Sequence, residues 1–183
     1  MIRVMHKKTA RPLLFAIIYL FLFMGIGVKN LYAKERAGVV LTPAYSFFSN
    51  LKNHNFKKLW NLLTLNSKQY ITDNIENSFK KHHVKIGKNK IYQNMSKGGY
   101  IAKAYWTGFL KTFKPNMVLK YSVWKIKSIG SKSAKIEIDY KYGKAPTIFD
   151  MYKQNGKWKF GLIESLYGRI LMKKITHAVI NKF

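Results

Sequence analysis

An Asn-Gly dipeptide at residues 155–156, set between two alternating stretches, constrains the fold more than any other feature of the chain. A two-residue type I′ turn needs φ > 0 at both central positions, so the dipeptide predicts a β-hairpin. The turn also sets the register of the two strands. The predicted facing pairs are Gln154 with Lys157, Lys153 with Trp158, Met151 with Phe160, and Phe149 with Leu162. This register gathers the apolar side chains on one face and turns the intervening residues to the other, namely Asp150, Tyr152, Lys159 and Gly161.

The period of the apolar residues changes from helical to alternating at Pro115. We expect three short helices within residues 43–79, the first capped by Thr42-Pro43, and a helix over residues 101–113. Four antiparallel strands are expected within residues 118–164, the first over 118–129. Residues 80–99 are rich in lysine and glycine and predict a mostly exposed connection. Helices followed by a meander of strands predict an α+β fold, with the N-terminal helices packed on an antiparallel sheet.

The N-terminus carries an apolar run over residues 13–28, preceded by four basic residues. This order predicts an export segment that leaves the N-terminus in the cytoplasm. Sixteen helical residues would reach about 24 Å, short of a bilayer core of about 30 Å. Cleavage after Ala33 and retention as an anchor both remain open. Residues 1–33 are thus a predicted signal peptide or single-span anchor, 34–41 a linker, 42–164 the domain, and 165–183 a C-terminal amphipathic helix.

The chain has 34 Lys and Arg residues against 7 Asp and Glu, and only four of the basic residues are Arg. Without residues 1–33, 29 basic and 7 acidic residues leave a net charge of +22. This charge predicts attraction to an anionic surface. Lys-, Asn- and Ile-rich usage also follows from an AT-rich genome, so both interpretations stay open. Nucleic acid is not an expected partner, because an exported chain meets little of it and Arg, the usual bidentate donor, is scarce.

The helical segments at residues 42–48 and 56–63, with the closing hairpin sequence Asn155-Gly156-Lys157-Trp158, resemble the nuclear transport factor 2-like family. This is the cystatin-like α+β roll in the form found in small exported bacterial proteins. The resemblance covers residues 42–164 and implies a strongly bent sheet around a conical apolar pocket. Family members include isomerases and cyclases, but also non-catalytic binding domains such as the periplasmic part of an inner-membrane secretion component. The fold alone therefore implies no particular activity.

Catalytic residues are few in this sequence. An isomerase of this fold needs an acid or base inside its apolar pocket, and the one weak candidate is Asp150. The hairpin register places Asp150 opposite Gly161, away from the apolar face. His82 and His83 are adjacent and share no face, so no metal site is predicted, and no cofactor is expected. The chain has no cysteine, which excludes disulfides and thiolate sites.

Five aromatic residues are candidates to line the mouth of a ligand pocket, although aromatic residues at regular spacing are more often core. They are Trp60, Tyr105, Trp106, Trp124 and Tyr140. The sequence favours a non-enzymatic, exported binding or assembly module of the bacterial cell envelope, periplasmic or anchored in the inner membrane. Its expected partner is an anionic membrane surface or an envelope protein. The alternatives are a carrier of a small apolar ligand or lipid in the sheet cavity, and an isomerase- or cyclase-like enzyme using a pocket carboxylate.

Overall fold

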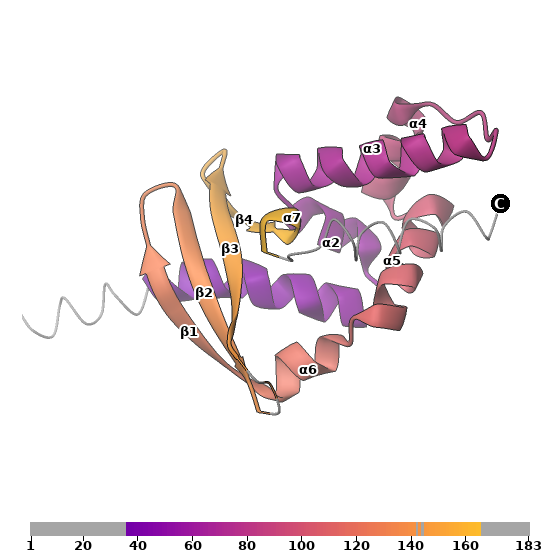
Figure 1. The fold of residues 1–183 in the computed structure, drawn as a ribbon. Helices are drawn as coiled ribbons and strands as arrows, with labels where there is room; N and C mark the ends of the chain where they lie inside the picture. The colour runs from indigo at the N-terminus through magenta and orange to yellow at the C-terminus, as the bar shows by residue number, and fades with distance from the viewer. Residues whose placement is uncertain (1–35, 142, 144, 166–183) are drawn as a thin grey trace, which may run out of the picture. The chain divides into compact units, whose positions relative to one another are not determined.

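Four strands that follow one another in sequence form a single antiparallel sheet (Figure 1). The computed structural model describes residues 36–165 except 142 and 144. The strands are β1 (Ser122–Ile129), β2 (Ser133–Tyr140), β3 (Thr147–Gln154) and β4 (Lys157–Gly161). Helices precede the sheet, so the predicted α+β class and the antiparallel meander are confirmed.

The β3–β4 hairpin has the predicted turn and register. Asn155 and Gly156 have φ values of 49° and 74°, in the left-handed region that a type I′ turn requires. Gln154, Lys153 and Met151 face their predicted partners, but pairing stops at Asp150 with Gly161. The predicted Phe149–Leu162 pair is wrong, because Leu162 begins a short helix, α7 (Leu162–Ser165). Ser165 holds this turn in place, since its hydroxyl donates to the Gly161 carbonyl and accepts the Asp150 N–H at 2.8 Å.

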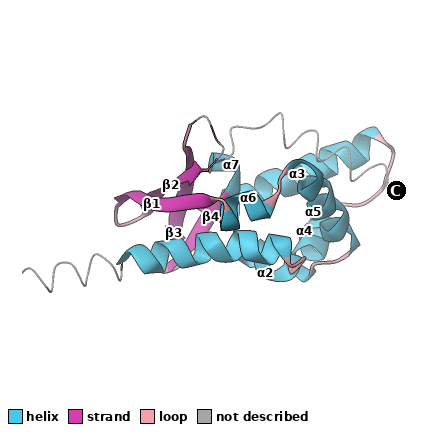
Figure 2. Ribbon diagram, turned by 90° about the horizontal axis from the view of Figure 1, so that it is seen from below, coloured by secondary structure: helices cyan, strands magenta, loops and turns pink. Residues whose placement is uncertain are grey.

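A helix over residues 36–52 lies against the apolar face of the sheet, and Figure 2 shows it running beneath the strands. Its Phe47 ring stacks on Phe160 with centroids 4.5 Å apart, and its Phe48 ring stacks on Phe149 at 5.1 Å. The predicted helix start at Thr42-Pro43, after a linker over 34–41, is wrong. The apolar stripe begins earlier, with the fully buried Val40, so Pro43 lies inside the helix.

Two further helices, α2 (Phe56–Leu62) and α3 (Leu65–Lys81), follow where they are expected, but α3 is 17 residues long and runs two residues beyond the predicted limit at residue 79. The cap of α3 is Thr64, whose hydroxyl oxygen accepts the Ser67 N–H at 3.1 Å. α3 buries Ile71, Ile75 and Phe79 on one face, as their spacing predicts.

Residues 80–99 are not the exposed connection that their composition predicts, because they contain helix α4 (Lys88–Lys97). Ile91 and Met95 lie one turn apart and are fully buried against neighbouring helices. The helix ends at Gly98, which has a φ of 69° and is the left-handed residue of the cap. The Asn94 side chain accepts the Ile101 N–H at 2.8 Å and so links α4 to the next helix. Two buried side chains and a glycine cap are enough to fix this helix on the domain.

Helix α5 (Tyr100–Thr112) matches the predicted helix, and Pro115 then begins another short helix, α6 (Pro115–Lys120). The predicted first strand over 118–129 is therefore too long at its start, because β1 begins at Ser122. Proline suits the first turn of a helix, where its missing N–H would have no partner. The Trp124 indole N–H donates to the Val118 carbonyl at 3.0 Å and fixes α6 beside β1.

The predicted export segment over residues 1–33 lies outside the described residues, and so does the C-terminal amphipathic helix over 165–183, apart from Ser165. Within residues 36–165, no helix combines the length and the apolar character that crossing a bilayer requires. The described residues from Val39 onward belong to one compact unit. The candidate site is therefore sought in this unit.

Candidate functional site

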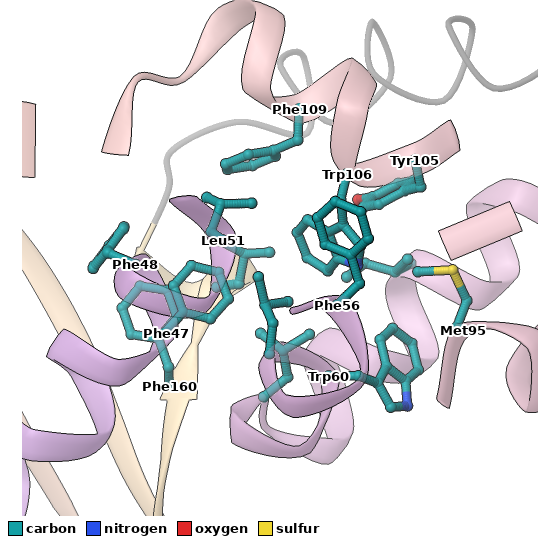
Figure 3. Close-up of a cluster of buried hydrophobic side chains, with 14 of the residues drawn as sticks. Phe47, Phe48, Leu51, Phe56, Trp60, Met95, Tyr105, Trp106, Phe109 and Phe160 are labelled. Atoms are coloured by element: carbon teal, nitrogen blue, oxygen red, sulfur yellow. The ribbon is translucent and has the colours of Figure 1, made fainter. Parts of the chain in front are cut away.

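The apolar face of the sheet is covered by aromatic side chains. Phe160 lies at its centre, with its ring centroid 4.5 Å from that of Phe47 and 5.4 Å from those of Phe48 and Phe149. Figure 3 shows Phe47 and Phe160 packed together, with Trp106 farther into the helical part. These rings are at most 1% exposed. A void large enough for water would leave part of their surface accessible, so no such void adjoins them.

The five aromatic residues predicted to line a pocket mouth do not surround one opening. Trp60, Tyr105 and Trp106 are at most 1% exposed and belong to the core of the helical part. Trp124 and Tyr140 are half-buried and lie on the two neighbouring strands β1 and β2. The indole N–H groups of Trp60 and Trp106 have no hydrogen-bond acceptor among the described residues. The structure thus divides the predicted set into a buried group and a group near the surface.

Three shallow grooves border Trp124 or Tyr140. The first has a volume of about 290 Å³ and is lined by Leu41, Thr42, Tyr45, Ser46 and Trp124. The second has a volume of about 250 Å³ and is lined by Thr112, Phe113, Lys114, Met117, Val118, Tyr140 and Gly143. The third has a volume of about 480 Å³ and is lined by Lys120, Tyr121, Ser122, Val123, Asp139, Tyr140, Lys141 and Gly143. The first two linings include no carboxylate. The carboxylate of the third, Asp139, is exposed on β2 and is not enclosed in an apolar pocket of the kind that an isomerase needs.

Asp150 lies on the outer face of the sheet, as its register predicts. It pairs with Gly161 across the hairpin, and its carboxylate accepts from the Lys135 ammonium at 3.1 Å. Its side chain is 17% exposed and forms an ion pair with a lysine that is 55% exposed. Asp150 is therefore a partly solvated member of a surface ion pair on the face away from the apolar core.

The other carboxylates of the described domain also lie outside the core. Three form ion pairs with lysines: Asp73 with Lys88, Glu76 with Lys80, and Glu137 with Lys127. The buried polar residues of the described chain are serines and threonines, and none is acidic. No group of three His, Asp or Glu residues in residues 36–165 could hold a metal ion. His82 and His83 lie at the exposed end of α3.

Glu164 joins the sheet to the start of α3. Its carboxylate accepts from the Ser67 hydroxyl at 2.9 Å, from the Asn66 amide at 3.1 Å and from the Thr64 hydroxyl at 3.2 Å. A carboxylate at a helix N-terminus is stabilised by the helix dipole. The hydroxyl and amide donors engage this carboxylate, which makes it a structural link between two parts of the chain that are about a hundred residues apart.

Three lysines that the sequence pattern does not single out lie beside the start of α3, namely Lys68, Lys157 and Lys159. The Lys159 ammonium donates to the Asn61 carbonyl at 2.6 Å, and the Lys68 ammonium lies 6.0 Å from the centroid of the Trp60 ring. Burial lowers the pKa of Lys68, and the charge of Lys159 lowers it further. Burial likewise lowers the pKa of Lys159, with a further contribution from Lys157. Within the described residues, no carboxylate lies within 4.0 Å of these three ammonium groups.

Comparison with known proteins gives no relative for this chain: no family model, no curated protein and no solved structure matches it. The resemblance to the nuclear transport factor 2-like family therefore stays a prediction from the sequence. The candidate site has to be judged from its own geometry and charge.

Proposed function

We propose that the domain is a non-enzymatic binding or assembly module of the bacterial cell envelope, exported and held near an anionic membrane surface by its lysines. The observation that carries this proposal is an uninterrupted cationic stretch. Fourteen lysines and no carboxylate lie between Glu76 and Glu137, and all fourteen are exposed. Each exposed lysine near an anionic membrane contributes about 1 kcal/mol, within a Debye length of about 8 Å at physiological salt.

The packing supports a binding module over the two alternatives. A carrier of an apolar ligand needs an open cavity, but the rings at the centre of the sheet face, those of Phe47, Phe48, Phe149 and Phe160, are at most 1% exposed. An isomerase needs a carboxylate in an apolar pocket, but Asp150 points outward and is paired with Lys135. The surface that is left for function is the cationic exterior of the domain.

The cystatin-like roll and membership of the nuclear transport factor 2-like family are part of the same proposal. The four-stranded antiparallel sheet, with a helix on its apolar face and a closing hairpin at Asn155-Gly156, supports them. Export rests on the apolar run over residues 13–28 and the basic residues before it.

Vesicle flotation with the full chain tests the proposal. Vesicles of phosphatidylcholine alone measure binding through the apolar N-terminal segment, and vesicles that also contain phosphatidylglycerol measure the added effect of negative charge. We expect added binding to the anionic vesicles that fades as salt rises from about 0.05 to 0.5 M, because salt screens exposed charges. Replacing Lys114, Lys120 and Lys125 with Gln should weaken this added binding. Equal binding to both kinds of vesicle at low salt would reject the proposal.

A further inference from the structure

The outer edge of β4 lies against the junction between α2 and α3. Leu63 forms a parallel bridge with Phe160, and the Thr64 N–H donates to the Phe160 carbonyl at 3.1 Å. The Leu65 N–H donates to the Gln154 side chain at 3.0 Å, at the other end of the same hairpin. These contacts fix the first turn of α3 beside the outer face of β4. The first turn of α3 and the outer face of β4 both carry lysines.

Lys68 of α3 and Lys159 of β4 are both half-buried at this junction. Lys159 donates to the Asn61 carbonyl in the last turn of α2, and Lys68 lies over the face of Trp60. Lys157 lies two residues before Lys159 on the same face of β4, so a third positive charge is close by. Partial burial of an ammonium without an anionic partner is unfavourable, because desolvation penalises its charged form.

Two lysines elsewhere on this sheet face do have such partners. Lys127 of β1 lies 3.9 Å from Glu137, and Lys135 of β2 lies 3.1 Å from Asp150. The carboxylate nearest to the cluster along the chain is Glu164, which already accepts from Thr64, Asn66 and Ser67. The three lysines on β4 and α3 therefore lack the carboxylate partners that Lys127 and Lys135 have.

We propose that Lys68, Lys157 and Lys159 form a binding site for a phosphate group, supplied by an anionic lipid headgroup or by free phosphate. A phosphate would face three ammonium groups and relieve the repulsion between them. Lysine binds phosphate as a point charge, without the bidentate geometry that favours Arg for carboxylates. If the phosphate belongs to a lipid headgroup, this inference rests on the proposed function, and the three lysines are then the part of the domain that contacts the membrane.

Side-chain NMR of the full chain, with inorganic phosphate as the probe, tests the site directly. We expect saturable shifts at the Nζ atoms of Lys68 and Lys159 and a rise in the pKa of both when phosphate binds, because an anion favours the charged ammonium. The double substitution Lys68→Met and Lys159→Met should abolish saturable binding. The matched control, Lys103→Met with Lys111→Met, removes the same charge from exposed lysines of α5 and should leave it unchanged. Absence of a saturable shift, or its equal loss in both variants, would overturn the site.

Vesicle flotation separates the two sources of phosphate. If the headgroup is the ligand, the site variant loses more binding to anionic vesicles than the control, and inorganic phosphate competes with the vesicles. If free phosphate is the ligand, phosphate saturates the site but both variants bind vesicles equally. An unchanged chain that binds no anionic vesicles rejects the proposed function whatever the phosphate titration shows. If the double variant fails to fold, as seen by circular dichroism, the single substitutions Lys159→Gln and Lys157→Gln take its place.

Discussion

Phe160 is the side chain whose removal tests most directly whether the apolar face of the sheet is filled. It is fully buried, and its ring meets three others, those of Phe47, Phe48 and Phe149. Truncation to Ala removes all three contacts. The backbone hydrogen bond from Thr64 to the Phe160 carbonyl is independent of the ring, so it can remain. The substitution therefore measures ring packing rather than loss of the strand.

Phe→Ala substitutions in packed cores cost about 3–5 kcal/mol, and the central place of Phe160 among three rings puts the expected loss near 4 kcal/mol. This is a large part of the stability of a typical domain, about 5–15 kcal/mol. Phe160→Leu keeps most of the volume and should cost about 1.5 kcal/mol. With a urea m value of about 2 kcal/mol/M, Phe160→Ala should unfold at a urea concentration about 2 M lower.

Urea unfolding followed by far-UV circular dichroism measures these losses in the full chain. Lys103→Ala, at an exposed position of α5, should change stability by no more than about 0.5 kcal/mol. A loss below about 1 kcal/mol for Phe160→Ala, with an unchanged m value, would show that the ring borders an open space. That result would refute the packing argument and favour a ligand carrier.

Three further predictions concern α4, the core tyrosine and the edge of the sheet. Ile91→Ala should lower the free energy of unfolding by about 3 kcal/mol in urea, because the side chain is fully buried. The control Lys90→Ala should change it by no more than about 0.5 kcal/mol, and equal effects would contradict the packing of α4. Burial raises the pKa of Tyr105 well above its usual value, so its contribution to stability is complete below about pH 10 and is lost as pH rises further. Tyr105→Phe should lessen the fall in the urea midpoint between about pH 9 and 11, and an equal fall in both proteins would contradict this. Among the described strands, β1 pairs with β2 only, so its other edge is unpaired and its lysines oppose pairing with another chain. Lys125→Val with Lys127→Val should therefore cause concentration-dependent association in light scattering. A strictly monodisperse variant would refute this role of the two lysines.

Local stereochemistry explains which parts of the fold the sequence predicts. The conformation of Asn155-Gly156 depends on two residues, so the turn and four facing pairs of the hairpin follow without knowledge of the tertiary structure. The end of the pairing does not follow, because Leu162 leaves the strand for a helix that is held by the Ser165 hydroxyl. Helix α4 was missed for a similar reason. Its two apolar residues become informative only once α2, α3 and α5 surround them.

The candidate site depends still more on tertiary structure. Lys68 and Lys159 lie in segments that are far apart in sequence, and the bridge between Leu63 and Phe160 is what brings those segments together. In the sequence, these lysines look the same as the exposed ones. Only burial separates them, and burial is a property of the folded chain.

The two classes of lysine should differ in their response to salt. Exposed lysines act on a membrane through solvent, so their contribution is screened within about 8 Å at physiological salt. Lys68 and Lys159 are half-buried, and direct contact with a phosphate in a drier site is screened much less. Phosphate binding should therefore fall less steeply with salt than vesicle binding, and the site variant should make vesicle binding more dependent on salt than the Lys103 and Lys111 control does. If vesicle binding fell equally with salt for the unchanged chain, the site variant and the control, the cluster would act only as part of the general positive charge.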